Sequence, residues 1–78
     1  MNRLGEVLHL STNKNLILRT NSKVKTKIPV FNEELHQIGI IYDVFGPVNK
    51  PYVSIKPTIN NSKQYIGHFL YTMNSEEI

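Results

Sequence analysis

Short apolar segments alternate with polar, turn-forming segments along most of the chain. Residues 4–10 mix β-forming side chains with leucines and end at the turn-forming cluster 11–15, after which residues 16–19 are again largely apolar. Two such runs joined by a few turn-forming residues are typical of a β-hairpin. The pattern therefore predicts that the chain begins with a pair of antiparallel strands.

The longest apolar run covers residues 38–45. Read with a period of two, one face holds Ile38, Ile40, Tyr42 and Val44, and the other holds Gly39, Ile41, Asp43 and Phe45. Because both faces are largely apolar, we expect this strand to lie centrally in a sheet or to be covered on its outer side.

Proline shapes the stretch that follows this run. Three of the four prolines, Pro47, Pro51 and Pro57, stand close together, and Gly46 comes immediately before the first of them. Proline fixes φ at about −65° and has no backbone donor, so these residues direct the path of the chain. We expect a rigid loop after residue 45 and then a short strand over 52–56, with Val53 and Ile55 on one face.

The remaining segments also indicate strands. Residues 29–31 are a short extended piece, residues 60–64 are a polar loop, and residues 65–71 read as a turn that leads into a final strand. No segment longer than one turn has the apolar spacing of a helix. Five or six short strands at this spacing predict a small closed all-β barrel, because closure removes the exposed edges of a small sheet.

Composition limits the possible classes of protein. The chain has 78 residues, of which 40% are hydrophobic, so we expect one folded domain over residues 1–78, with 73–78 as a flexible tail. It has no cysteine, hence no disulfide and no thiolate metal site. No apolar run approaches the roughly 18 residues of a membrane span and no signal peptide is evident, so we expect no membrane partner and a cytoplasmic location.

The residues that could carry chemistry are few and scattered. His9, His36 and His68 lack the spacing of a zinc site. Asp43 has no acid or nucleophile near it in sequence, and we expect its carboxylate to accept hydrogen bonds from amides near Gly46. The sequence therefore predicts a protein that is not an enzyme, with no catalytic residue, no metal and no cofactor.

Two binding functions remain open. One is a small barrel that binds RNA directly, which needs aromatic and cationic side chains interleaved on one strand face; Tyr52 and Lys56 alone fit that description on a short strand. The other is a protein-binding module whose proline-braced loop docks on a larger protein. The net charge of +3 permits contact with a polyanion without establishing it.

Residues 38–57 carry a family resemblance. The run Ile38-Gly39-Ile40-Ile41-Tyr42-Asp43-Val44-Phe45-Gly46-Pro47-Val48, followed by Pro51-Tyr52-Val53-Ser54-Ile55-Lys56-Pro57, resembles the hallmark of the Gar subunit of H/ACA ribonucleoproteins. Residues 3–9 and 67–71 are similar to the first and last strands of that family, so the resemblance covers nearly the whole chain. Without glycine- and arginine-rich tails, the chain resembles the compact archaeal form; a eukaryotic source would imply a nucleolar location.

The resemblance implies a six-stranded antiparallel barrel related to those of translation factors. It also implies a non-catalytic subunit in a complex with a pseudouridine synthase, two further small proteins and an H/ACA guide RNA. In that family the subunit binds the synthase directly and influences a mobile loop that grips substrate, which aids substrate loading and product release during modification of ribosomal RNA. Contact with the guide RNA and the two small proteins is expected to be indirect.

Carried over by the motif, nine residues are predicted to form the partner interface: Val44, Phe45, Gly46, Pro47, Val48, Pro51, Tyr52, Val53 and Ile55. Some of them must belong to the core, since Val53 and Ile55 share a strand face. We expect Phe45, Val48 and Tyr52 to make the main contacts, because large apolar side chains dominate interface energy. A β-branched residue in place of Gly46 should damage the loop if the φ of Gly46 is positive.

A second set of residues is predicted to contact RNA at the edge of the complex: Lys23, Lys25, Lys27 and Lys56. The first three alternate within a polar segment that is more lysine-rich than the family pattern. Such a run is more typical of a solvated loop or of a strand edge protected by charge than of a phosphate-binding site, so its role stays open at the level of sequence.

Overall fold

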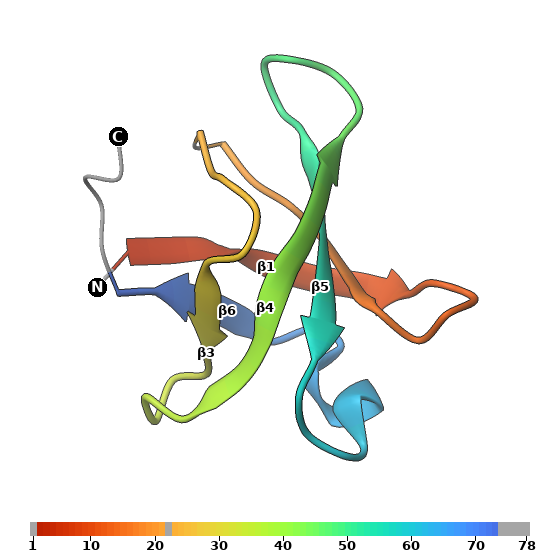
Figure 1. The fold of residues 1–78 in the computed structure, drawn as a ribbon, viewed down its shortest axis with the longest axis vertical. Coiled ribbons are helices and arrows are strands. Elements are labelled where there is room, and N and C mark those ends of the chain that lie inside the picture. The colour runs from red at the N-terminus through yellow and green to blue at the C-terminus, as the bar shows by residue number, and fades with distance from the viewer. Residues whose placement is uncertain (1, 22, 74–78) are drawn as a thin grey trace.

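Six strands close into one antiparallel barrel in the computed structural model, which describes residues 2–21 and 23–73 (Figure 1). The strands are β1 (Asn2–Leu10), β2 (Leu16–Arg19), β3 (Pro29–Phe31), β4 (Gln37–Phe45), β5 (Tyr52–Pro57) and β6 (Phe69–Thr72). Their order around the barrel is β1-β2-β5-β4-β3-β6. The predicted all-β, six-stranded antiparallel barrel is confirmed.

The connections between strands also follow the sequence pattern, with one addition. Among the described residues, one 3-10 turn, η1 (Ser62–Tyr65), covers the end of the polar loop predicted over 60–64 and the first residue of the turn predicted after it. No described residue belongs to a helix that is long and apolar enough to cross a membrane. Of the tail predicted over residues 73–78, all but Met73 lies outside the described residues.

Every strand contributes to the core. Its buried members are Leu4, Val7, Leu16, Leu18, Val30, Ile38, Ile41, Val53, Ile55 and Leu70, each at most 4% exposed. Full burial of one such side chain stabilises the fold by about 1.5–3 kcal/mol before entropy is counted. A chain without cysteine therefore holds its barrel together through this apolar interior.

The faces of β4 differ from the predicted grouping. Ile38 is 1% exposed whereas Ile40 is 37% exposed, so these two residues do not share a face. The pairing of β3 with β4 shifts register between Val30 and Phe31, and the pairing of β4 with β5 shifts between Ile41 and Asp43. An extra residue at each irregularity reverses the inward and outward alternation, which a strict period of two cannot anticipate.

The outer side of β4 is left open by the described residues. Along this side Ile40 is 37%, Tyr42 64% and Phe45 44% exposed. β4 does lie between β3 and β5, as expected for a central strand. Of the two predicted alternatives, the central position is therefore the one observed. Among the described residues the outer side of β4 stays exposed, and the exposed row ends at the loop described next.

Candidate interaction site

The loop between β4 and β5 stands at one end of the barrel, at the top of Figure 1. Gly46 begins it with a φ of +95°, a backbone conformation that residues other than glycine rarely adopt. The positive φ that the prediction for Gly46 requires is therefore present. Val48, near the tip, is 94% exposed, the highest exposed fraction among the large hydrophobic residues described as exposed.

Two aromatic rings brace the base of this loop. Phe45 ends β4 and pairs with Tyr52, which begins β5. Their ring centroids are 5.6 Å apart and their planes differ by 21°, so the rings stack. Such a pair contributes about 0.5–1.5 kcal/mol beyond the area it buries, and here it ties together the two residues that flank the loop.

Arg19 extends this pair to a third strand. It pairs with Tyr52 from β2, and its guanidinium carbon lies 4.9 Å from the centroid of the Tyr52 ring. The Nε of Arg19 donates a hydrogen bond of 3.2 Å to the carbonyl oxygen of Lys50, inside the loop. We call Arg19, Tyr52 and Phe45 the rim stack; it orders the loop before any partner arrives.

We expect Arg19→Ala to lower the free energy of unfolding by about 1 kcal/mol. The substitution removes one exposed cation–π contact and one hydrogen bond to a loop carbonyl. Each of these contributes at most about 1 kcal/mol at an exposed site. Urea denaturation of the purified protein measures the effect. Arg3→Ala is the matched control, because Arg3 stacks 4.3 Å from the Phe69 ring on another face of the barrel.

An open groove lies along the other side of the loop. It has a volume of about 820 Å³ and runs between the β4–β5 loop and the segment that follows β2. A hydrogen bond of 3.0 Å from the Thr20 amide to the Pro51 carbonyl holds these two segments together. The groove is lined by Asn21, Lys23, Val24, Lys25, Val44, Phe45, Gly46, Pro47, Val48, Asn49 and Pro51.

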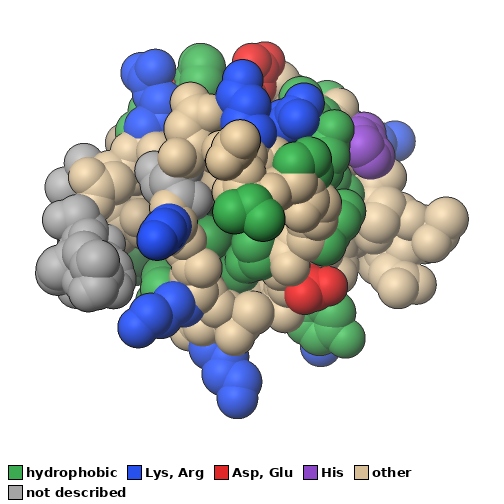
Figure 2. All heavy atoms as spheres, turned by 90° about the horizontal axis from the view of Figure 1, so that it is seen from above, with side chains coloured by type: hydrophobic (Ala, Val, Ile, Leu, Met, Phe, Trp, Pro, Cys, Tyr) green, Lys and Arg blue, Asp and Glu red, His purple; other side chains and the backbone are tan. Residues whose placement is uncertain are grey.

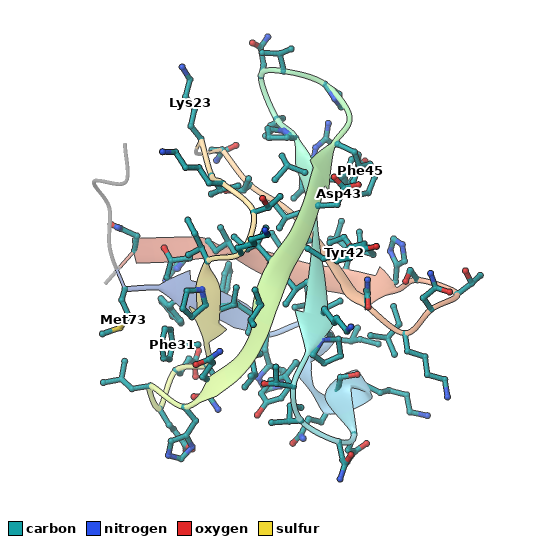
Figure 3. The ribbon with its side chains drawn as sticks, viewed as in Figure 1. Lys23, Phe31, Tyr42, Asp43, Phe45 and Met73 are labelled. Carbon is teal, nitrogen blue, oxygen red and sulfur yellow. The ribbon has the colours of Figure 1, made fainter. Side chains whose placement is uncertain are left out.

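The figures show how this groove is placed. Figure 2 looks down on this end of the barrel, where hydrophobic side chains gather near the middle of the face. Several lysine and arginine side chains lie around them, and an acidic side chain lies at one edge of the hydrophobic patch. In Figure 3, Lys23 and Phe45 lie on opposite sides of the upper end of β4. Phe45 belongs both to the rim stack and to the lining of the groove, so the rim stack and the two lysines meet at this end of the barrel.

Most of the predicted partner residues meet at this end of the barrel. Six of them, Val44, Phe45, Gly46, Pro47, Val48 and Pro51, line the groove, and Tyr52 belongs to the rim stack. Val53 and Ile55 are both 0% exposed, because their face of β5 points into the barrel. The prediction of partner contact is corrected for these two residues, which support the site from the core; for the other seven it stays a prediction.

The four lysines predicted to contact RNA do not form one patch. Lys23 and Lys25 line the groove. The backbone amide of Lys27 donates to the carbonyl of Ile41, which places it beside the middle of β4. Lys56 pairs with Ile40 toward the far end of β5. The structure therefore joins two of these lysines to the predicted protein interface and separates the other two from it.

The sequence pattern did not indicate Arg19, Asn21 or Asn49 as members of the site. Arg19 ends the short strand β2, and nothing near it in sequence shows that β2 lies beside β5. Asp43 is closer to its prediction: its Oδ1 accepts a hydrogen bond of 2.9 Å from a backbone amide, which is that of Val44 rather than one in the loop.

Metal chemistry finds no support in the described part of the chain. Within residues 2–21 and 23–73, no three His, Cys, Asp or Glu side chains come together in a way that could hold a metal ion. The polar residues of the site are lysines, an arginine and two asparagines, and they surround apolar side chains. Side chains of these kinds are suited to binding another macromolecule.

The comparisons with known proteins agree with the motif in residues 38–57. The family described as "Gar1/Naf1 RNA binding region" matches residues 1–77. An uncharacterized protein of Methanothermobacter thermautotrophicus is 37% identical over 75 residues, covering 91% of this chain and 82% of that relative. An uncharacterized protein of Methanocaldococcus jannaschii is 38% identical over 63 residues, covering 80% of this chain and 74% of that relative.

Proposed function

Because the chain belongs to the Gar1/Naf1 family of RNA-binding proteins, we propose that it is a non-catalytic subunit of an H/ACA guide-RNA pseudouridylation complex. In this proposal it binds the pseudouridine synthase subunit directly through the β4–β5 loop. The guide RNA and two further small subunits share the complex without direct contact. The proposed location is the cytoplasm, and the process served is the modification of ribosomal RNA.

The observation that carries the proposal is an apolar loop that is exposed yet already ordered. Val48 is 94% exposed, while Gly46 and the rim stack hold the loop at its base. Binding a preordered loop avoids the cost of about 0.5–1.5 kcal/mol for each flexible side chain that would otherwise have to be fixed. Exposed apolar side chains on such a loop are suited to filling a pocket of a partner protein.

The proposed mechanism acts on a mobile loop of the synthase that grips substrate. A binding partner shifts the equilibrium between two positions of a loop only if it binds one position better than the other. A rigid rim can discriminate in this way, because it does not adapt equally well to both positions. The subunit then aids substrate loading and product release without contributing a catalytic residue.

Val48→Asp tests the proposed contact. We expect the variant to bind a purified archaeal pseudouridine synthase at least tenfold more weakly, which corresponds to about 1.4 kcal/mol, because the carboxylate would have to be buried in an apolar pocket. Isothermal titration calorimetry gives the affinity. Leu35→Asp is the matched control, since Leu35 is 53% exposed in the turn between β3 and β4, at the other end of β4.

Two results would contradict the proposal. Equal weakening by Val48→Asp and Leu35→Asp would mean that the loop is not the contact surface. If the unchanged protein failed to bind the synthase but bound RNA alone in a salt-sensitive way, the alternative function would replace it: a stand-alone β-barrel that binds RNA directly. The family's RNA-binding description and the net charge of +3 are what favour this alternative.

A further inference from the structure

The groove beside the β4–β5 loop has a one-sided charge. Lys23 and Lys25 line it on the side of the segment after β2, and both are exposed. Among the described residues that line the groove, none is acidic. An occupant with negative charge would therefore be attracted by two cations and repelled by no carboxylate within the groove itself.

The rest of the lining decides between RNA and protein as the occupant. Single-stranded RNA is held by aromatic faces on which successive bases stack. Phe45 is the one aromatic side chain among the described lining residues, and one face of its ring already contacts Tyr52. The other apolar members are the aliphatic or proline side chains of Val24, Val44, Pro47, Val48 and Pro51. A lining of this kind favours a peptide with apolar side chains.

The size and polar groups of the groove fit an extended peptide. Its volume of about 820 Å³ lies within the range of roughly 300–1,000 Å³ that is usual for ligand pockets, so it can take a few side chains. Asn21 and Asn49 line it from opposite segments. Their side-chain amides can both donate and accept hydrogen bonds, which matches the needs of a peptide backbone.

We propose that this groove binds an extended segment of the pseudouridine synthase in which a carboxylate side chain stands next to apolar ones. The carboxylate pairs with Lys23 and Lys25, and the apolar side chains contact Val44, Pro47 and Val48. This inference rests on the proposed function and assigns the two lysines to a protein partner rather than to RNA.

Charge reversal at the groove tests the inference. We expect Lys23→Glu/Lys25→Glu to bind the synthase about tenfold more weakly at low salt and to lose most of the salt dependence seen with the unchanged protein. The matched control is Lys14→Glu/Lys63→Glu, which changes the net charge equally. Lys14, in the β1–β2 turn, and Lys63, in η1, are exposed and lie at the strand ends remote from the groove.

A second measurement identifies the segment. Overlapping synthetic peptides that tile the catalytic domain of the synthase are probed with the unchanged protein and with both double variants. We expect the unchanged protein and the control to bind peptides that combine Asp or Glu with apolar residues. Replacing that carboxylate by lysine in the peptide should abolish this binding and restore binding to Lys23→Glu/Lys25→Glu.

The outcomes separate this inference from the proposed function. If both double variants bind the synthase as well as the unchanged protein does, the inference is wrong and the proposed function stands. If Lys23→Glu/Lys25→Glu weakens binding to guide RNA alone and leaves synthase binding intact, the lysines serve RNA and the inference is again wrong. If the unchanged protein does not bind the synthase, both the proposed function and this inference are wrong.

Discussion

Gly39→Val is expected to lower the free energy of unfolding by about 3 kcal/mol, at the upper end of what overpacking of a core usually costs. A Cβ at this position would lie 2.7 Å from Cγ2 of Ile55 and 2.7 Å from the carbonyl oxygen of Lys56. The second of these atoms belongs to the backbone of β5, so relief requires moving a strand rather than turning a side chain. Urea denaturation followed by circular dichroism measures the loss.

The size of this effect matters because the barrel is small. A domain of 78 residues has a free energy of unfolding of roughly 4–12 kcal/mol, so the substitution removes a large part of it. Gly67→Val is the control: Gly67 has a φ of +87° and nothing lies within 4 Å of the position that a Cβ would take there, so only backbone strain is added. A Gly39→Val protein as stable as the unchanged one would show that β4 and β5 can move apart at little cost in free energy.

The strands could be predicted because each is a short apolar run between turn-forming residues. Residues 16–19 and 29–31 coincide with β2 and β3, and the proline-bracketed run after residue 51 is β5. The inward face of β5 also follows from simple alternation, since Val53 and Ile55 are both fully buried. Local patterning was sufficient wherever a strand keeps an uninterrupted period of two.

A strict alternation of inward and outward residues gave the wrong faces where the pairing of β4 with its neighbouring strands is irregular. Tyr42 lies at the register shift between Ile41 and Asp43, and it is 64% exposed. A bulge depends on how two strands fit against each other, and nothing in the sequence of β4 alone marks its position. The grouping of Ile38 with Ile40 was wrong because of the second irregularity, in the pairing of β3 with β4, where Ile38 stands unpaired between Gln37 and Gly39.

The candidate site was predictable only in part, because it is assembled by barrel closure. The proline-rich loop was evident from the sequence, but its neighbours Lys23 and Arg19 come from segments more than twenty residues earlier. They reach the loop because β2 pairs with β5. Local sequence reasoning had assigned the lysines and the loop to different partners, and their common groove becomes visible only in the folded chain.

The second large effect is expected for Gly46→Val, which should weaken binding to the synthase by about 100-fold or more. Valine at a φ of +95° adds backbone strain of about 2 kcal/mol. Its Cβ would also lie 3.0 Å from Cδ2 of Tyr52, which is closer than ordinary van der Waals contact. Relief would displace Tyr52 from between Arg19 and Phe45, and the loop would lose the rim stack that orders it.

Gly67→Val again provides the control, because it places the same β-branched side chain at a similar φ of +87° without a neighbour to displace. Both variants should lose stability through backbone strain, and Gly46→Val should lose somewhat more because it also disturbs the rim stack. Gly46→Val alone should lose affinity for the synthase in titration calorimetry. Loss of affinity in both variants would trace the effect to general destabilisation, while full affinity in Gly46→Val would show that binding does not depend on an ordered loop. Selective loss would tie recognition to the positive φ at the base of the loop, since a preordered loop binds without the entropy cost that a disordered one must overcome.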